Sequence, residues 1–210
     1  PAPAAAEPGT TVEVRDLFFA TPARLKFLKA ARTEFGHAVD VIHRLAMAHP
    51  EIAFSLSNGQ RVAVRLGATT GDLFARRLDR LSQIMGRDFA ANALRVDAQR
   101  EDITLTGYIG LPTLNRRTAS HQFFFVNGRP VRDKQLFGAV RGAYMDFLAH
   151  DRHPLLALFI DLPPTQVDVN VHPAKTEVRF REPGMVRGLI VGALKQALAD
   201  AGHRSATSAS

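Results

Sequence analysis

Hydrophobic and polar residues alternate through residues 167–180, VDVNVHPAKTEVRF. The three valines at the start of this segment share one face and the polar residues between them share the other, which is the period of a half-buried strand. The alternation stops at residues 172–175 and resumes at Glu177. Because Pro173 has no N–H to give to a strand ladder, we expect a loop there. The pattern predicts that Lys175 lies at the tip of a short, stiff connection; a simple solvated lysine is the alternative.

The first 86 residues show mainly helical spacing of their apolar positions, with one hairpin. The dipeptide Asn58-Gly59 is the strongest turn signal in the chain. Proline at position 22 suits the first turn of a helix, and Pro50 ends the next one. In order, we expect a strand over 10–19, a helix over 23–30 capped by Thr21, a helix from its N-cap Thr33 to Pro50, strands over 52–56 and 61–66, and a helix over 72–85 that ends at Gly86.

From residue 88 onward the pattern is dominated by strands. Residues 155–162 are nearly all apolar, which predicts a central strand covered on both faces. Asp133 is a candidate N-cap for a helix with one apolar side. In order, we expect strands over 93–98 and 103–109, a basic connection over 115–120, a strand over 122–126 that turns at Asn127-Gly128, a helix over 134–149, the strand over 155–162, and a last helix from Pro183.

These elements predict an α/β fold of the α+β sandwich type, divided into two domains. The opening PAPAAAEPG has the composition of a tail or linker. We expect a disordered linker over 1–8, a first domain over 9–80, a second over 81–202 and a disordered tail over 203–210.

Composition adds a polyanion partner as a possibility and removes several other classes. The net charge is +7, and 17 basic against 12 acidic residues follow Asp79. A local basic excess of this kind suits DNA or RNA, and a solvated charged face is the alternative. The absence of cysteine excludes disulfides and thiolate metal sites. No apolar run is long enough to span a bilayer. Six basic residues fall within one short region: Arg116, Arg117, Arg129, Arg132, Lys134 and Arg141.

Three motifs together are specific. They are GTT followed by LFFATPARLKF, then FFFVNGRPVRDK, then VDVNVHPAKTEVRF, and they extend from Gly9 almost to the end of the chain. In this combination and order they resemble the MutL/PMS family of DNA mismatch-repair proteins. The resemblance implies the end of a GHKL ATPase domain followed by a transducer domain with the fold of ribosomal small-subunit protein five, domain two.

The resemblance also implies roles for single residues in binding ATP. Lys175 would reach the γ-phosphate of ATP held by the neighbouring domain, and Thr10, with Thr11 as its competitor, would hold the adenine. Ala20 stands where the family usually has asparagine, so any polar contact made by that asparagine is absent. We expect a structural role for Arg24 and for three further residues: Asp168, Asn170 and His172. We expect no catalytic and no metal-binding residue in this chain.

The VNGR segment would present cations to DNA phosphates, giving binding that depends on salt and not on base sequence. The expected DNA-binding residues are Arg129, Arg132, Lys134, Arg116 and Arg117. The phenylalanines of residues 123–125 could stack on bases, but we expect them to alternate between two buried faces.

For the intact protein, the resemblance implies ATP and Mg²⁺ as cofactors. It further implies double- and single-stranded DNA, mismatch-recognition and downstream repair proteins as partners, a homodimer of the N-terminal half, and a cytoplasmic, nucleoid-associated bacterial protein without membrane contact. Two alternatives stay open: the transducer half of a type II topoisomerase, and a stand-alone nucleic-acid-binding module.

The family's glutamate base, magnesium-binding asparagine, D-x-G-x-G turn and glycine-rich lid do not occur within residues 1–210. Without these groups, neither the attacking water nor the metal is held for phosphoryl transfer. We therefore expect the purified chain to bind ATP poorly and to show no turnover in a phosphate-release assay. Measurable, Mg²⁺-dependent turnover would contradict this expectation.

Overall fold

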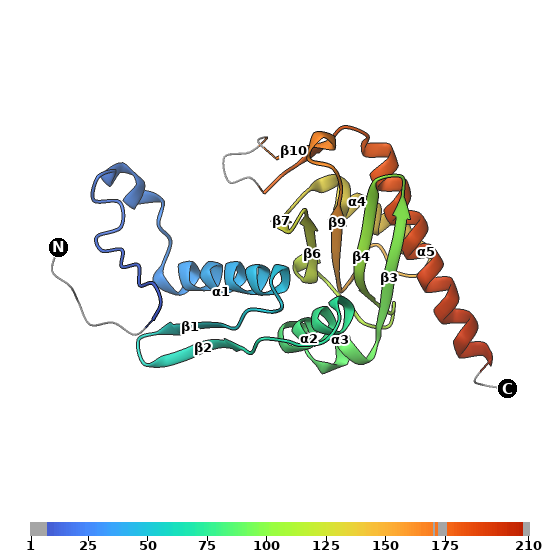
Figure 1. Ribbon diagram of the computed structural model, residues 1–210, viewed down its shortest axis with the longest axis horizontal. Coiled ribbons are helices and arrows are strands. Elements are labelled where there is room, and N and C mark those ends of the chain that lie inside the picture. The colour runs from blue at the N-terminus through green and yellow to red at the C-terminus, as the bar shows by residue number, and fades with distance from the viewer. Residues whose placement is uncertain (1–7, 170, 172–175, 208–210) are drawn as a thin grey trace. The chain divides into compact units, whose positions relative to one another are not determined.

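The computed structural model describes residues 8–169, 171 and 176–207, and for residues 203–207 only the backbone is considered (Figure 1). The chain divides into two compact units, residues 1–38 and 39–210. Each unit is considered by itself.

The first unit contains a 3₁₀ helix and the start of a long helix. The expected strand over 10–19 is wrong: these residues form no strand, and Val12 and Val14 are exposed. Asp16 and Phe18 instead adopt positive φ and fold the chain into successive turns. The 3₁₀ helix η1 is Pro22–Phe27, and the Thr21 side chain makes no capping hydrogen bond, so the expected capped α-helix is also wrong. Helix α1, Ala31–Ala48, begins before Thr33, which therefore is not its N-cap.

A hairpin and two helices open the second unit. The hairpin is formed by β1 (Phe54–Asn58) and β2 (Arg61–Leu66), and it is followed by α2 (Leu73–Met85) and α3 (Arg87–Ala91). These bounds confirm the turn at Asn58-Gly59 and the helix end at Gly86. Asp72 caps α2 by accepting a hydrogen bond from the Ala75 N–H at 2.8 Å. The buried Arg80 of α2 donates to the carbonyls of Pro50 and Ile52, which ties the helix to the chain entering the hairpin.

A mixed five-stranded sheet forms the centre of the second unit. Its strand order is β3-β4-β9-β6-β7, with β6 and β9 parallel and the other pairs antiparallel. The strands are β3 (Ala93–Arg100), β4 (Ile103–Gly110), β6 (Gln122–Val126), β7 (Arg129–Val131) and β9 (Leu156–Asp161). The expected position of the apolar strand β9 at the middle of the sheet is confirmed.

The sheet is covered on both faces, so the fold is mixed α/β as expected. Helices α4 (Lys134–Tyr144) and α5 (Pro183–Thr207) pack on one face, and α5 runs along β3 and β4 (Figure 1). Residues of α2 and α3, with Met47 from the end of α1, cover the other face. Phe124 belongs to the first core, and Phe123 and Phe125 belong to the second. The three phenylalanines therefore alternate between two buried faces, and base stacking is excluded by their burial.

Short elements complete the described chain. Helix α4 ends at Tyr144, earlier than the expected Ala149, and α5 continues to Thr207, through residues for which we expected a disordered tail. Among the described residues of the alternating segment 167–180, the strands are two residues long, Val167–Asp168 and Arg179–Phe180. The short elements of the second unit are β5 (Asn115–Arg116), η2 (Ala119–His121), β8 (His153–Pro154), η3 (Pro164–Gln166), β10 (Val167–Asp168) and β11 (Arg179–Phe180).

The sheet imposes a strict requirement at Gly107 in β4. Its φ is +139°, and an added Cβ would lie 2.1 Å from the Ala157 carbonyl oxygen of the neighbouring strand. We expect Gly107→Ala to lower the free energy of unfolding by about 3 kcal/mol or more, because both the backbone strain and the clash with a paired strand must be accommodated. Urea unfolding followed by circular dichroism measures this.

Gly192 in α5 is the matched control, since nothing lies within 4 Å of its added Cβ. We expect Gly192→Ala to stabilise the protein by about 0.5–1 kcal/mol through helix propensity. Equal effects of the two substitutions would contradict the role assigned to Gly107.

Candidate functional site

The residues expected to contact the nucleotide lie in two different parts of the chain. Thr10 and Thr11 are exposed and outside regular secondary structure in the first unit. Lys175, Asn170 and His172 lie outside the described residues. A common nucleotide site for Lys175 and the threonines therefore stays a prediction.

The segments on both sides of Lys175 are anchored to the second unit. Arg132 donates its backbone N–H to the Thr176 carbonyl at 2.6 Å, directly after Lys175. Arg181 donates its backbone N–H to the Gln166 carbonyl at 2.8 Å, which closes the pairing of β10 with β11. The base of the loop is thus held by main-chain hydrogen bonds, and one of them comes from the VNGRPVR segment.

The turn between β6 and β7 is rigid and presents Arg129 to solvent. Asn127 and Gly128 both have positive φ, as a tight hairpin turn requires. The Asn127 side-chain carbonyl accepts a hydrogen bond from the Leu162 N–H at 2.9 Å, and the Asn127 N–H donates to the Ile160 carbonyl at 2.9 Å. These bonds fix the turn against the end of β9, so the exposed side chain of Arg129 extends from an immobile backbone.

Arg132 is held by a carboxylate that the sequence did not single out. Its guanidinium lies 2.8 Å from Asp40 of α1, and Arg44 lies 2.9 Å from the same carboxylate. Burial by itself raises the pKa of Asp40, but the hydrogen bonds and charges of Arg44 and then Arg132 outweigh it, so the pKa lies below its usual value. Arg44 is nearly buried and rests 4.9 Å from the centre of the Phe123 ring. Asp40 is therefore a charged link between α1 and the β7–α4 connection.

Lys134 is the first residue of α4, just after its cap Asp133. Asp133 accepts hydrogen bonds from the Gln135 and Leu136 N–H groups at 2.8 and 3.4 Å, which confirms the expected cap. Lys134 also borders a cavity of about 840 Å³. Three arginines share that border and were not among the expected site residues: Arg141, Arg152 and Arg187. The sequence marks Arg141 only by its charge, and Arg152 and Arg187 come from segments with no motif.

Arg116 lies beside the same cavity, whereas Arg117 has no described contact of its own. Strand β5 pairs with β8, which sets Arg116 opposite His153, another residue that lines the cavity. Both arginines are exposed. Burial lowers the pKa of the nearby His121, and the charge of Arg116 lowers it further. Three of the five expected DNA-binding residues, Arg129, Arg132 and Lys134, thus lie on one continuous segment from the start of β7 to the start of α4, and Arg116 lies near the cavity that Lys134 borders.

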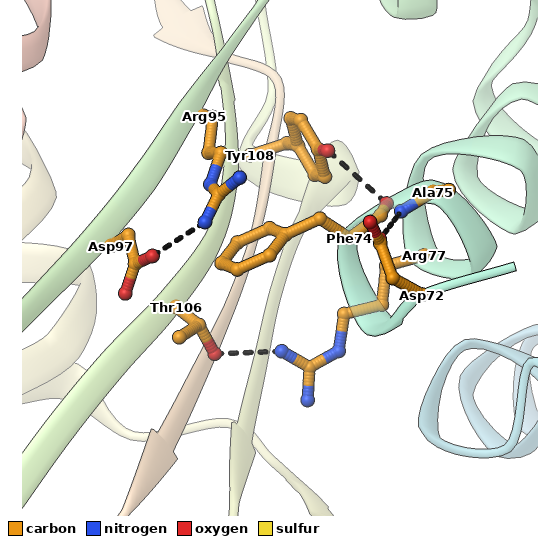
Figure 2. Close-up of polar contacts among 8 residues, drawn as sticks. All are labelled: Asp72, Phe74, Ala75, Arg77, Arg95, Asp97, Thr106 and Tyr108. Atoms are coloured by element: carbon orange, nitrogen blue, oxygen red, sulfur yellow. Dashed lines mark hydrogen bonds and ion pairs between the residues drawn. The ribbon is translucent and has the colours of Figure 1, made fainter.

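Two arginines between α2 and the sheet pack against aromatic rings. Arg77 of α2 donates to the Thr106 hydroxyl at 2.6 Å (Figure 2). Its guanidinium lies 3.7 Å from the centre of the Phe159 ring. Arg95 of β3 lies 3.4 Å from the centre of the Phe74 ring and pairs with Asp97 (Figure 2). Burial lowers the pKa of Arg77, which Asp161 partly opposes. These cations attach α2 to the sheet through cation–π contacts.

Neither a metal-binding cluster nor a membrane-spanning helix is found among the described residues. Among the described residues, no group of three or more histidine and acidic side chains could hold a metal ion. No helix in the part of the chain that the structure describes is long and apolar enough to cross a membrane.

Residues 81–199 match the family described as "DNA mismatch repair protein, C-terminal domain". This match covers more than half of the chain and the entire sheet with α4 and most of α5. The chain therefore belongs to the DNA mismatch repair protein family.

Within this family the relatives are MutL proteins. The chain is 64% identical over 210 residues to the DNA mismatch repair protein MutL of Rhodospirillum rubrum, covering 100% of this chain and 33% of that protein. It is 63% identical over 207 residues to MutL of Paramagnetospirillum magneticum, covering 99% of this chain and 34% of that protein. The chain thus spans about a third of the length of the curated relatives it matches. These findings favour the mismatch-repair interpretation over the type II topoisomerase alternative.

Solved structures agree with the family. The ATPase domain of Aquifex aeolicus MutL in complex with ADP is 25% identical, with a TM-score of 0.55, over 84% of this chain and 55% of that one. The N-terminal domain of a DNA repair protein is 23% identical, with a TM-score of 0.68, over 88% of this chain and 59% of that one, and shows the same fold. The GHKL ATPase and transducer type of fold expected from the motifs is confirmed.

The link through Asp40 predicts a pH-dependent contribution to stability. We expect Asp40→Asn to lower the free energy of unfolding by about 0.5–1 kcal/mol near neutral pH, a small value because Arg132 and Asp40 are partly exposed. Since the folded-state pKa of Asp40 is depressed, its contribution is present above the unfolded-state pKa of about 3.9 and is lost as the pH falls through the lower folded-state value.

Urea unfolding of both proteins at neutral pH and at acidic pH measures this difference. Asp146→Asn is the control, because Asp146 pairs with Lys195 only at 3.4 Å and both are exposed. A difference between Asp40→Asn and the unmodified chain that persists unchanged in acid would contradict the charged link.

Proposed function

We propose that this chain is the part of a MutL-type mismatch-repair ATPase that couples the nucleotide to DNA. Residues 9–80 would supply the end of the nucleotide-binding domain, and residues 81–202 would supply a lysine for the nucleotide and a basic surface for DNA. The ADP complex of Aquifex aeolicus MutL supports an adenine nucleotide as the ligand. The match to MutL extends over the whole chain, which supports a MutL-type role for both of these parts.

One observation carries this proposal: the Arg132 N–H holds the Thr176 carbonyl. Thr176 follows Lys175, the proposed γ-phosphate contact, and Arg132 is a proposed DNA contact. A main-chain hydrogen bond therefore joins the segment of the proposed DNA contact to the segment that follows the proposed nucleotide contact. A change in the position of Lys175 on nucleotide hydrolysis would act directly on the backbone that carries Arg132, and DNA bound at Arg132 would act on the loop.

At the nucleotide, the chain's own residues would contribute charge and orientation. The Lys175 ammonium would neutralise the γ-phosphate, and a hydroxyl of Thr10 or Thr11 would orient the adenine. Mg²⁺ would neutralise phosphate charge when it is bound. Among the described residues, no group of three or more histidine and acidic side chains could hold it.

At the DNA, the expected residues would contact phosphates and would not contact bases. Arg129 and Lys134 are exposed and have no carboxylate partner among the described ion pairs, so they are available without prior rearrangement. Arg132 would exchange Asp40 for a phosphate, and Arg116 and Arg117 would extend the contact. Such an arrangement binds double- and single-stranded DNA without sequence preference.

In the whole protein we propose that ATP closes two such halves into a homodimer on DNA. The closed form would then engage mismatch-recognition and downstream repair proteins. We propose that this assembly forms on DNA in the bacterial cytoplasm.

Replacement of Arg129, Arg132 and Lys134 by alanine tests the DNA contact. In fluorescence anisotropy with a labelled duplex, we expect the unmodified chain to bind with a steep loss of affinity between low and moderate salt. In the triple variant, the slope of log K against log salt should become shallower by up to about 0.9 for each phosphate that is no longer neutralised.

A triple alanine variant of Arg61, Arg65 and Arg87 is the matched control, because it removes the same charge from exposed positions on β2 and α3. Equal weakening in both variants would show that only net charge matters and would contradict a DNA site at the VNGR segment. No binding by the unmodified chain at low salt would contradict DNA binding by this unit alone.

A further inference from the structure

The helical face of the second unit carries an apolar groove that no motif indicated. The cavity of about 840 Å³ lies between α4, α5 and the segment that leads into β8, with Phe137, Met145 and Leu148 among its apolar residues. A second hollow of about 470 Å³ adjoins it and shares Leu148, Ala149 and Arg152 with the first. The two hollows share this part of their lining and are together called the groove.

Two large apolar side chains in this groove are exposed. Met145 is 69% exposed in the first hollow, and Phe147 is 46% exposed in the second. Exposed methionine and aromatic side chains so close together are typical of a surface that binds another apolar group. The Phe137 and Tyr144 rings are less accessible: Phe137 is half-buried and forms a T-shaped pair with Phe124 at 5.0 Å, and Tyr144 is buried with its hydroxyl bonded to the Gly110 carbonyl.

Small residues on α4 open the groove and let a cation lie across it. Gly138 and Gly142 are one turn apart on the side of α4 that meets α5. A Cβ on Gly142 would lie 3.3 Å from the Arg187 guanidinium, and one on Gly138 would lie 3.7 Å from it. Arg187 therefore rests on the bare backbone of α4 at the border of the groove.

The border of the groove is positively charged. Lys134, Arg141, Arg152 and Arg187 line it, and no aspartate or glutamate is among the lining residues. In the part of the chain that the structure describes, no carboxylate lies within ion-pair distance of these four cations. Arg141 contacts the ring of His150 instead. The groove thus joins an apolar floor to a cationic border without internal counterions.

We propose that this groove binds an acidic peptide segment of a partner protein. Two large hydrophobic side chains of the peptide would enter the two hollows, and its carboxylates would meet the cations on the border. A nucleic acid fits less well, because phosphates bound at the cationic border would leave the apolar side chains of the floor, Met145 among them, without a partner. Charge complementarity and two adjoining hollows are what a short amphipathic acidic segment requires.

The probe for this proposal is a fluorescein-labelled synthetic peptide in which one leucine and one phenylalanine are set within a run of glutamates. Two control peptides replace the two hydrophobic residues with serine or the glutamates with lysine. We expect the 210-residue chain to bind the first peptide and to bind each control peptide at least about tenfold more weakly.

Two variants address the two halves of the recognition separately. Arg141→Glu with Arg187→Glu reverses charge on the border, and Met145→Ser removes apolar surface from a mostly exposed position where folding is not at risk. We expect each to weaken peptide binding about tenfold or more. Arg61→Glu with Arg87→Glu makes the same charge change away from the groove and should leave peptide binding unchanged.

Peptide binding that is absent, or that is equal in all these variants, would overturn the proposal. A labelled oligothymidine separates this site from the DNA surface. If Arg141→Glu with Arg187→Glu abolishes oligothymidine binding and the peptide does not bind, the groove belongs to the DNA surface and the peptide proposal is wrong. The DNA contact at Arg129 is tested by its own variant and does not depend on this outcome.

Discussion

Burial of strand β9 on both faces is the constraint on which the second unit depends. The strand occupies the middle of the sheet, antiparallel to β4 and parallel to β6. Its side chains alternate between the two cores, as do the phenylalanines of β6 beside it. Each core covers one face of the same strands, so loss of either core would expose apolar side chains of β9 and β6 to water. The helices α2 and α3 on one face and α4 and α5 on the other therefore stabilise a single structure. This rigid sheet also gives the functional segments a fixed reference, because the turn at Asn127 is bonded to the end of β9. The Thr176 carbonyl accepts a hydrogen bond from the Arg132 N–H in turn, so the segment that begins at Thr176 is fixed to the connection between β7 and α4.

Periodicity predicted the elements that carry a buried face. The strands β3, β4, β6 and β9 of the central sheet, the hairpin at Asn58-Gly59 and the caps at Asp133 and Gly86 were anticipated, because burial and turn chemistry are local signals; the short strand β7 was not. The segment at 10–19 was not, since its alternation of Val12 and Val14 is not matched by burial, and turns at Asp16 and Phe18 replace the strand. Pattern alone does not reveal whether a sheet exists to receive a strand.

The candidate sites divide in the same way. Motifs identified Arg129, Arg132 and Lys134, which are close in sequence. They did not identify Asp40, which is 92 residues from Arg132, or Arg187, which reaches the same region from the last helix. Partners of this kind are set by how α1, α4 and α5 pack, and no local sequence signal records them.

Asp40 gives Arg132 a property that its exposed neighbours lack. The carboxylate acts as an intramolecular counterion, occupying the place that a dissolved anion takes beside Arg129 or Lys134. A phosphate that replaced it would still release a cation condensed on the DNA, but the ion pair between Arg132 and Asp40 would be broken in the exchange. Asp40 would keep Arg44 at 2.9 Å and would not be left without a cation. If a phosphate displaced Asp40 from Arg132, the protein would lose the ion pair between Arg132 and Asp40 and keep the one between Arg44 and Asp40.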